Sequence, residues 1–351
     1  MKSFKPEYTL TNSIVQDLTI ISESKAIIDR AKILPANEIK LRRQALVRMT
    51  QSSTAIEGNV LNQHQVEDLV AGKKVDAPAK DIHEVKNYLS ALKYIEKIVD
   101  KKQKINQRVF LHIHKLVTKN TLPKQDSGLF RNRPVYVVRH FLGLNKKVVY
   151  TAPIYSKVPE LVNNLIIWLN QPKTRNINPV IVAGVVHQEI AAIHPFVDGN
   201  GRVARAISTL VLYQRGYDFR KLFALEDFYN LNRNKYYQAI NTGQSYKTSK
   251  NLTTWLSYFV AGFKEEITSV RYKIQQLSLK NIDPNSPKLF LNQDQQKIID
   301  FIDQVGKITS QDVVDILSIP KRTAQLKLAK LKKIKIIKQV GKGPSSAYII
   351  K

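Results

Sequence analysis

The run from Val180 to Tyr213 constrains the fold of this chain most strongly. Val180–Ile193 is almost continuously apolar, and Val203–Tyr213 is apolar with few helix breakers. Both segments therefore predict buried helices. The connection between them holds a histidine, an aspartate, two glycines and two arginines. A polar loop between two core helices is a rigid mount, so we expect a binding site there.

The turn in this loop favours an anion. Asn200 lies between Gly199 and Gly201, and glycine adopts backbone angles closed to other residues while leaving space for a ligand. A helix is expected to begin directly after the turn. Because the first N–H groups of a helix are free and its dipole is positive at that end, the turn predicts a phosphate site.

The charged residues of the loop fit the same chemistry. Arg202 and Arg205 are three residues apart and share one helix face, so both can point toward a bound anion. Asp198 is a candidate Mg²⁺ ligand beside phosphate oxygens. His194 is the candidate base, since imidazole is largely neutral at physiological pH. Phe196 is expected to point inward and fix the loop to the core.

Taken singly, these features also occur in ordinary surface turns; together they predict a phosphate site with a base. The run His194–Arg205 matches the pattern H-x-F-x-[D/E]-G-N-G-R-x-x-R of the Fic family at every specified position, and the chain is therefore similar to Fic proteins. The resemblance implies a mainly α-helical bundle that transfers AMP from ATP to a hydroxyl of a target protein. It also implies that His194 deprotonates the hydroxyl, Asp198 binds Mg²⁺, Gly199, Asn200 and Gly201 cradle the α- and β-phosphates, Arg202 assists the phosphates, and Arg205 holds the γ-phosphate.

An upstream segment resembles the inhibitory motif [S/T]-x-x-x-E-[G/N] of the same family. It begins at Ser53, and its glutamate is Glu57, at the end of a helix expected over about 36–58. The resemblance implies that Glu57 pairs with Arg205 and occupies the γ-phosphate position. The alternative is a solvated charge at a helix C-terminus, where a carboxylate is mildly unfavourable.

Two further segments match the family more weakly. Gly128–Val138 and Lys147–Pro153 predict a β-hairpin, which resembles the flap that holds a target segment by strand addition; an ordinary surface hairpin is the alternative. Of the neighbouring residues Tyr236 and Tyr237, we assign Tyr237 to an adenine pocket, although aromatic residues at helical spacing usually belong to the core. The resemblance spans roughly residues 82–264.

The C-terminal segment has a different character. Helices expected at 292–302, 309–317 and 320–333, followed by strands at 334–340 and 346–350, resemble a winged helix-turn-helix, whose third helix would contact DNA. Residues 285–351 contain 13 Lys and Arg against 5 Asp, a net charge of +8. The whole chain is basic, with a net charge of +28, so a protein-binding module is an equal alternative.

The expected organisation is an N-terminal helical region 1–81 with the inhibitory helix, a catalytic domain 82–278, a linker 279–288 and a winged helix 289–351. Cysteine is absent, which excludes disulfides and cysteine-based sites. The N-terminus lacks the apolar core of a signal peptide, so we expect a cytoplasmic protein without a membrane contact.

Three functions stay open. The first is a protein adenylyltransferase that uses ATP and Mg²⁺, is restrained by Glu57, and modifies a hydroxyl of a target protein or of itself. The second is a bifunctional enzyme in which Glu57 also helps to remove AMP. The third is a DNA-associated regulator that only senses ATP. His194 favours an enzyme, since a sensor needs no base; a homodimer is left open.

Overall fold

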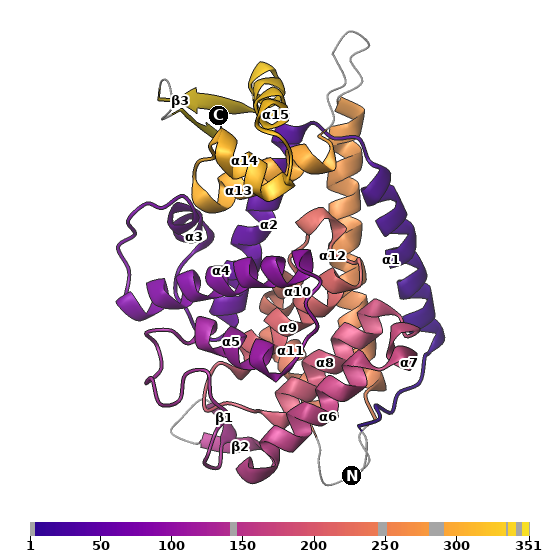
Figure 1. Cartoon of the computed structure of the whole chain (residues 1–351). Helices are drawn as coiled ribbons and strands as arrows, with labels where there is room; N and C mark the ends of the chain where they lie inside the picture. The colour runs from indigo at the N-terminus through magenta and orange to yellow at the C-terminus, as the bar shows by residue number, and fades with distance from the viewer. Residues whose placement is uncertain are drawn as a thin grey trace. The chain divides into compact units, whose positions relative to one another are not determined.

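The structure is a computed structural model in which most of the chain is helical (Figure 1). This confirms the mainly α fold class. It describes residues 4–140, 146–244, 251–280, 291–334, 336–341 and 346–350.

The chain divides into two compact units. Residues 30–41 group with the C-terminal segment, although they are far from it in sequence. The expected linker 279–288 lies mostly outside the described residues, and α12 continues to Lys280. The first unit comprises Met1–Asp29 and Arg42–Tyr272, and the second comprises Arg30–Leu41 and Lys273–Lys351.

The first unit is a helical bundle with one hairpin (Figure 1). Three of its helices, α1 with its last residue, α2 and α12, also contribute residues to the second unit. Its elements are α1 Asn12–Arg30, α2 Pro35–Ile56, α3 Gln63–Val70, α4 Ala79–Asp100, α5 Gln107–Val117, β1 Tyr136–His140, β2 Lys146–Thr151, η1 Tyr155–Lys157, α6 Val158–Asn170, α7 Pro172–Arg175, α8 Pro179–Ile193, α9 Asn200–Gln214, η2 Phe219–Lys221, α10 Leu225–Leu231, α11 Arg233–Gly243 and α12 Thr253–Lys280.

Helices α8 and α9 form the centre of this unit, as the apolar segments predicted. Every residue of α8 from Val180 to Ile193 is buried, and α9 is buried from Arg202 to Tyr213. A helix that is apolar on all sides packs only inside a core. Asn178 caps the start of α8, where Pro179 occupies the first turn, a position that tolerates its missing N–H. The loop between the two helices is thus anchored at both ends.

The predicted hairpin forms, but its first strand is shorter than expected. β1 and β2 pair antiparallel, with Tyr136 opposite Thr151. Gly128–Val135 was expected to be strand and is not. Gly128 has a positive φ of 79°, and the N–H of Arg131 binds the carbonyl of Pro195 instead of a neighbouring strand. The expected turn around residues 143–145 lies outside the described residues.

The predicted inhibitory helix corresponds to α2. It ends at Ile56, so Glu57 is the first residue after the helix. Glu57 and Gly58 close a turn on the last helical carbonyls, and Gly58 has a φ of 96°. That left-handed conformation suits glycine and ends the helix. The carboxylate of Glu57 therefore projects from a stiff helix end.

The second unit contains the elements expected from the sequence. Thr309 caps α14 with a reciprocal contact to Asp312, and the strands pair antiparallel from Ile337 opposite Ile350 to Val340 opposite Ala347. Ile298, Ile302, Ile308, Leu328 and Leu331 belong to one buried cluster that these elements enclose. The elements are α13 Gln293–Val305, α14 Ser310–Leu317, α15 Lys321–Lys333, β3 Ile337–Val340 and β4 Ala347–Ile350.

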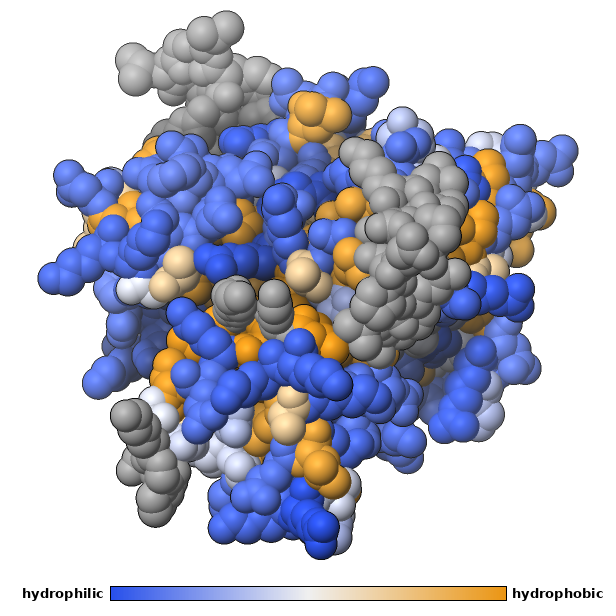
Figure 2. Space-filling view, turned by 90° about the horizontal axis from the view of Figure 1, so that it is seen from above, coloured by the Kyte–Doolittle hydropathy of each residue, from blue (hydrophilic) through white to orange (hydrophobic). Residues whose placement is uncertain are grey.

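One face of the molecule is predominantly hydrophilic. Figure 2 shows this face, on which blue, hydrophilic residues predominate and orange, apolar residues lie between them. Within the described ranges, none of the helices is both long enough and apolar enough to span a membrane. The apolar α8 is accordingly a core helix.

Candidate active site

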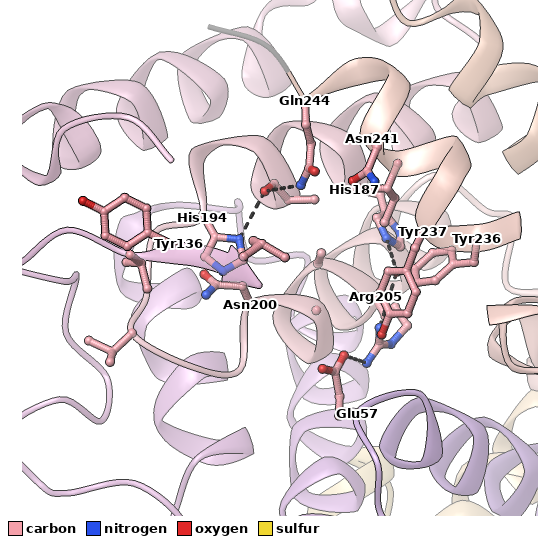
Figure 3. A pocket seen from close by; sticks show the side chains of 17 residues that line it. Glu57, Tyr136, His187, His194, Asn200, Arg205, Tyr236, Tyr237, Asn241 and Gln244 are labelled. Carbon is pink, nitrogen blue, oxygen red and sulfur yellow. Dashed lines mark hydrogen bonds and ion pairs between the residues drawn. The ribbon is translucent and has the colours of Figure 1, made fainter. Parts of the chain in front are cut away.

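A cavity of about 410 Å³ opens beside the loop between α8 and α9. Its three sides differ in origin (Figure 3). The His194 wall consists of His194 with Tyr136 and Val137 of β1. The Arg205 wall consists of Arg205 with Glu57, Gly201 and Tyr236. A third side contains Tyr237, Ile240 and Asn241 of α11 and Gln244, which directly follows this helix.

The backbone of the loop is held in a sharply turned conformation. His194 has φ 51° and ψ 58°, a left-handed conformation that ends α8. Gly199 has φ 79° and precedes the first turn of α9. Asn200 closes the loop on itself, because its side chain accepts from the Phe196 N–H and donates to the Phe196 carbonyl, both at 2.9 Å. The first N–H groups of α9, which have no partners within the helix, then lie at the cavity.

The imidazole of His194 is oriented as a base. Its Nδ1 lies 3.3 Å from the Ala191 carbonyl, which can only accept, so Nδ1 carries the proton in the neutral ring and Nε2 offers a lone pair. Burial lowers the pKa of His194, and the charge of Arg131 lowers it further, against opposite effects of Glu57 and Asp198. The ring is therefore neutral at physiological pH, as general-base action requires.

A second histidine supports the loop from behind. The buried His114 of α5 accepts from the Gly128 N–H at 2.9 Å and lies 3.0 Å from the Asp198 carbonyl. Its Nε2 must therefore carry the proton that binds this carbonyl. Burial lowers the pKa of His114 to about 4. Its ring stacks on the fully buried Phe196 at 3.8 Å, which confirms the expected inward position of Phe196.

Arg205 lies fully inside the site and meets the segment that resembles the inhibitory motif. Its Nε donates to Ser53 Oγ at 2.9 Å, and its Nη2 donates to the Ser53 carbonyl at 2.8 Å. The same Nη2 lies 2.7 Å from Glu57 Oε1. The Glu57 side chain is 30% exposed, while that of Arg205 is 1% exposed. The structure thus brings Ser53, Glu57 and Arg205 together across about 150 residues of sequence.

Glu57 occupies the space directly over the first turn of α9. A Cβ atom added at Gly201 would overlap Glu57 Oε1 and approach Arg205 Nη1 to 3.1 Å. Gly201 is therefore required for close approach, and the approaching group is a carboxylate oxygen. Since a helix N-terminus and an arginine both favour an anion, a phosphate would compete with Glu57 for this position.

Arg202 does not line the cavity, contrary to the expectation that both arginines point to one anion. Its buried guanidinium lies 3.4 Å from Glu84 Oε1 of α4 and 3.4 Å from Asp198 Oδ2. Asp198 itself is half exposed, and its Oδ1 accepts from the Gly199 N–H at 2.6 Å. Arg202 thus links α4 to the loop.

The side chains at the loop could hold a cation only if phosphate oxygens supplied further ligands. Asp198 offers one exposed carboxylate at the loop, and the described part of the chain has no group of three or more acidic, histidine or cysteine side chains that could hold a metal. Mg²⁺ commonly takes one or two carboxylates, substrate phosphates and water. The donor set therefore fits Mg²⁺ bound with a nucleotide.

Several residues around the cavity were not expected from the sequence. Asn241 and Gln244 follow Tyr237 by four and seven residues, so helical spacing could have placed all three on one face. Gln244 donates to the Ala191 carbonyl at 3.0 Å. Tyr236 is fully buried between His187 Nε2 at 3.0 Å and Arg205 Nη1 at 3.4 Å. His187 is itself fully buried.

The fold and the cavity together define a mainly helical protein whose central turn combines a helix N-terminus, a buried arginine and a neutral histidine. Residues 104–212 match the Fic/DOC family. The chain therefore contains a Fic domain. The matched segment includes α5, the hairpin, α8 and all but the last two residues of α9, so it contains both His194 and Arg205.

Similar proteins support this assignment. Protein adenylyltransferase Fic of Drosophila grimshawi is 29% identical over 202 residues, which cover 57% of this chain and 38% of that protein. The corresponding protein of Drosophila ananassae is 29% identical over 202 residues, with 57% and 36% covered. The match thus spans less than two fifths of these relatives.

Solved structures share the fold. A Fic family protein from Desulfovibrio desulfuricans G20 superposes with a TM-score of 0.64 at 23% identity, covering 99% of this chain and 98% of that one. Fic-1 of C. elegans, residues 134–508, superposes with a TM-score of 0.59 at 21% identity, covering 78% and 74%. At these identities the likeness concerns the fold.

Proposed function

We propose that the chain is an ATP-dependent protein adenylyltransferase. One observation carries the proposal: a neutral imidazole with a free Nε2 faces the same cavity as the first turn of α9 and Arg205. A base and a polyphosphate site in one cavity are the parts that a hydroxyl nucleophile and ATP require. The Fic domain and the similarity to proteins named protein adenylyltransferase support the same activity.

In this proposal the phosphates lie over the turn Gly199–Gly201. The free N–H groups of α9 bind their oxygens, and Arg205 binds the terminal phosphate by its planar fork. Asp198 holds Mg²⁺ together with the phosphates, and the bound ion would neutralise charge on them. Arg202 acts indirectly, because its contacts to Glu84 and Asp198 hold the loop in place.

The nucleobase lies on the α11 side of the cavity. Ile240 and the ring of Tyr237 offer apolar surface, and Asn241 offers an amide that can donate and accept. A purine requires such a combination of a flat apolar contact and a few polar groups. We therefore assign adenine binding to Tyr237 and Asn241.

The proposed reaction places His194 at the target hydroxyl. Nε2 takes the hydroxyl proton while the hydroxyl oxygen bonds to the α-phosphorus of ATP. The bond from the α-phosphorus to the bridging oxygen of the β-phosphate breaks, and pyrophosphate leaves with that electron pair. The target then carries AMP, and His194 carries one proton that it returns to solvent.

We further propose that Glu57 restrains this reaction. Its carboxylate holds Arg205 at 2.7 Å over Gly201, so ATP cannot place a phosphate there without displacing it. Because the pair leaves Glu57 partly exposed, solvent can receive the displaced carboxylate at modest cost. The same exposed carboxylate could orient a water toward an AMP-modified target, which keeps removal of AMP as a second candidate activity.

Labelled ATP tests the proposal. Glu57→Gly is incubated with Mg²⁺, candidate proteins and ATP labelled either on the α- or on the γ-phosphorus. Label from the α position should stay on protein, and label from the γ position should leave as pyrophosphate. Glu23→Gly, which changes an exposed glutamate, is the matched control and should behave like the unmodified chain.

Three outcomes would change the assignment. If the label from the γ-phosphorus stayed on protein, the chain would transfer a phosphoryl group and not AMP. Failure of Glu57→Gly to label any protein, including itself, while ATP binds, would favour an ATP sensor. Loss of AMP from a labelled target upon addition of the unmodified chain, and not of its Glu57→Gly variant, would establish the second activity.

We propose that the C-terminal elements α13–α15 and β3–β4 are a winged helix that contacts DNA through α15. Lys321, Arg322, Lys330 and Lys333 are exposed on this helix, whereas Lys327 is paired with Asp294 at 2.8 Å. Exposed cations along one helix suit phosphate contacts. A cytoplasmic location and a homodimer remain predictions from the sequence.

Salt-dependent binding tests this second proposal. The full chain should bind mixed-sequence duplex DNA with an affinity that falls as salt rises. Lys330→Glu with Lys333→Glu should abolish most of this binding, and Lys235→Glu, on an exposed position of α11, should not. An equal loss of DNA binding in both variants would indicate that the net charge of the chain alone attracts DNA. The C-terminal elements would then be better explained as a protein-binding module.

A further inference from the structure

A buried arginine outside the loop holds His194. Arg131 lies between α5 and β1 and is only 3% exposed. Its Nε donates to the His194 carbonyl at 2.8 Å, and its own N–H donates to the Pro195 carbonyl at 3.0 Å. Two consecutive carbonyls of the loop are thus bound by one residue from another segment.

The same guanidinium also binds both ends of the hairpin. Nη1 donates to the Arg133 carbonyl, three residues before β1, at 3.2 Å, and Nη2 donates to the Pro153 carbonyl, two residues after β2. Tyr150 of β2 adds a contact nearby, because its hydroxyl donates to the Ala192 carbonyl at 2.6 Å. The hairpin, whose Tyr136 and Val137 line the cavity, is therefore fastened to the C-terminal end of α8.

These contacts explain how His194 keeps an unusual backbone conformation. A non-glycine residue at φ 51° is strained, and such a residue persists only where its surroundings impose it. The left-handed turn directs the His194 carbonyl away from α8, where it needs a new donor. Arg131 supplies that donor, and no carboxylate partner for Arg131 occurs among the contacts of the described residues.

The charge of Arg131 has a second consequence. A buried guanidinium surrounded by carbonyls is costly, and here it lies close enough to His194 to lower the pKa of the imidazole after the larger effect of burial. The charges of Glu57, at the end of α2, and of Asp198 in the loop act on His194 in the opposite direction. Tyr136 of β1, Tyr237 of α11 and Arg205 of α9 line the same cavity.

We infer that Arg131 is a positioning residue that fixes His194 relative to the hairpin and places a buried positive charge near its imidazole. The inference rests on the proposed function, in which His194 takes the proton of a target hydroxyl. Lysine cannot replace it fully, because only the planar fork of arginine reaches three carbonyls in different directions.

Two substitutions separate geometry from charge. In a Glu57→Gly parent, Arg131→Gln should lower the turnover number roughly 100-fold, because a displaced base loses much of its contribution, and should leave the ATP affinity unchanged. It should also move the acidic limb of the pH–rate profile to higher pH. Arg131→Lys keeps the charge, so its turnover should fall while the limb stays in place.

Control variants test whether the effects are specific to Arg131 and whether the variants fold. Arg133→Gln removes a neighbouring, half-exposed arginine paired with Asp126 and should leave turnover and the pH profile unchanged. Tyr150→Phe removes one hairpin contact to α8 without touching His194, and should leave the acidic limb in place. Melting temperatures identify any variant that does not fold. If Arg131→Gln does not fold, Arg131→Lys, which keeps the positive charge, is used in its place.

A measurement without turnover distinguishes failure of this inference from failure of the proposed function. Nuclear magnetic resonance of the His194 ring, assigned by its loss in His194→Ala, gives its pKa in each variant of the full chain. Arg131→Gln should raise this pKa relative to the parent, and Arg133→Gln should not. An unchanged His194 pKa in a folded Arg131→Gln protein, or a full turnover number, would overturn the inference. An inactive parent with the expected pKa shift would contradict only the proposed function.

Discussion

The two walls of the cavity are held by different kinds of contact. On the His194 wall, buried donors bind backbone carbonyls: Arg131 binds those of His194 and Pro195, and Tyr150 binds that of Ala192. On the Arg205 wall, the contact that closes the site is an ion pair between side chains, and its acidic partner Glu57 is partly exposed. We expect the first wall to keep its geometry when a ligand binds, and the second to exchange its carboxylate for another anion.

This difference assigns separate tasks to the walls. Breaking a buried carbonyl contact leaves an unpaired polar group inside the protein, which costs about 1–3 kcal/mol. Displacing Glu57 instead moves a carboxylate into water and leaves Arg205 for a phosphate. We therefore expect changes on the His194 wall to affect turnover and changes on the Arg205 wall to affect nucleotide affinity.

The largest effect is expected for His194→Ala on the Glu57→Gly parent. Loss of the base should lower transfer by about 10²- to 10⁴-fold, because the other imidazole at the cavity, His187, is fully buried with its Nε2 bound to Tyr236. The ATP dissociation constant, measured by calorimetry, should stay the same. A strong loss of ATP affinity in His194→Ala would show that the His194 wall also contributes to nucleotide binding, and that the two walls do not act separately.

The second prediction concerns a carboxyl behind the Arg205 wall. Burial raises the pKa of Glu226 to about 7, above its ordinary value of 4.5, and Tyr88 donates to it at 3.0 Å. The Glu226 carboxyl then binds its proton more tightly in the folded than in the unfolded state. Its protonation therefore contributes fully to the free energy of unfolding below pH 4.5, and this contribution is lost as the pH rises to 7. Glu226→Gln should remove this loss.

Urea unfolding at several pH values measures the effect. Relative to the unmodified chain, Glu226→Gln should gain roughly 3 kcal/mol of stability between pH 4.5 and pH 8, from the size of the pKa shift. Glu23→Gln, on an exposed position of α1, should show no such gain. A constant difference across the pH range would mean that Glu226 does not titrate there.

The third prediction is a coupling between Glu57 and Arg205. Glu57→Gly should tighten ATP binding about 10-fold, because a hydrogen bond to a charged group contributes about 1.5–3 kcal/mol and Glu57 no longer competes for Arg205. Arg205→Ala should cancel this gain, while Arg233→Ala, on an exposed position of α11, should not. Additive effects of the two substitutions would show that Glu57 and ATP do not share Arg205.

The smallest effect is expected for Tyr237→Phe. Its hydroxyl donates to the Ile56 carbonyl at 3.2 Å, at the end of the helix that carries Glu57. Loss of this single bond should lower the free energy of unfolding by about 1 kcal/mol, measured by urea unfolding. The ring remains for the proposed contact with adenine, so ATP affinity should hardly change. A large loss of affinity would give the hydroxyl a direct role at the nucleotide.

Sequence patterns located the loop and its two helices because those features are local. The apolar runs of α8 and α9 and the glycines at 199 and 201 act over a few residues, where helical periodicity and backbone freedom apply. The hairpin was located less well, since Gly128–Val135 has apolar residues but its backbone binds the loop near Pro195. The position of Arg202 was also unexpected, because its partner Glu84 belongs to a distant helix.

Other parts of the site carried no local signal. His114 and Arg131 follow no motif, and their roles arise from carbonyls of residues 194–198 that approach them only in the folded chain. Glu226 looks like any charged residue of a helix start, and only its burial changes its pKa. Such effects depend on which segments pack together, and a single sequence does not reveal this.

The sequence by itself determined the chemical inventory of this protein: a base, an anion-binding turn, two arginines and an upstream carboxylate, on a mainly helical scaffold. These follow from side-chain chemistry and from short-range backbone preferences. Only the tertiary structure decided which of these groups face the cavity and which hold the loop in place. Packing of α4 against α9 directs Arg202 away from the cavity, and Arg131 fastens His194 to the hairpin. The physical reason is that unpaired carbonyls and buried charges take whatever partners the folded chain brings within hydrogen-bonding distance.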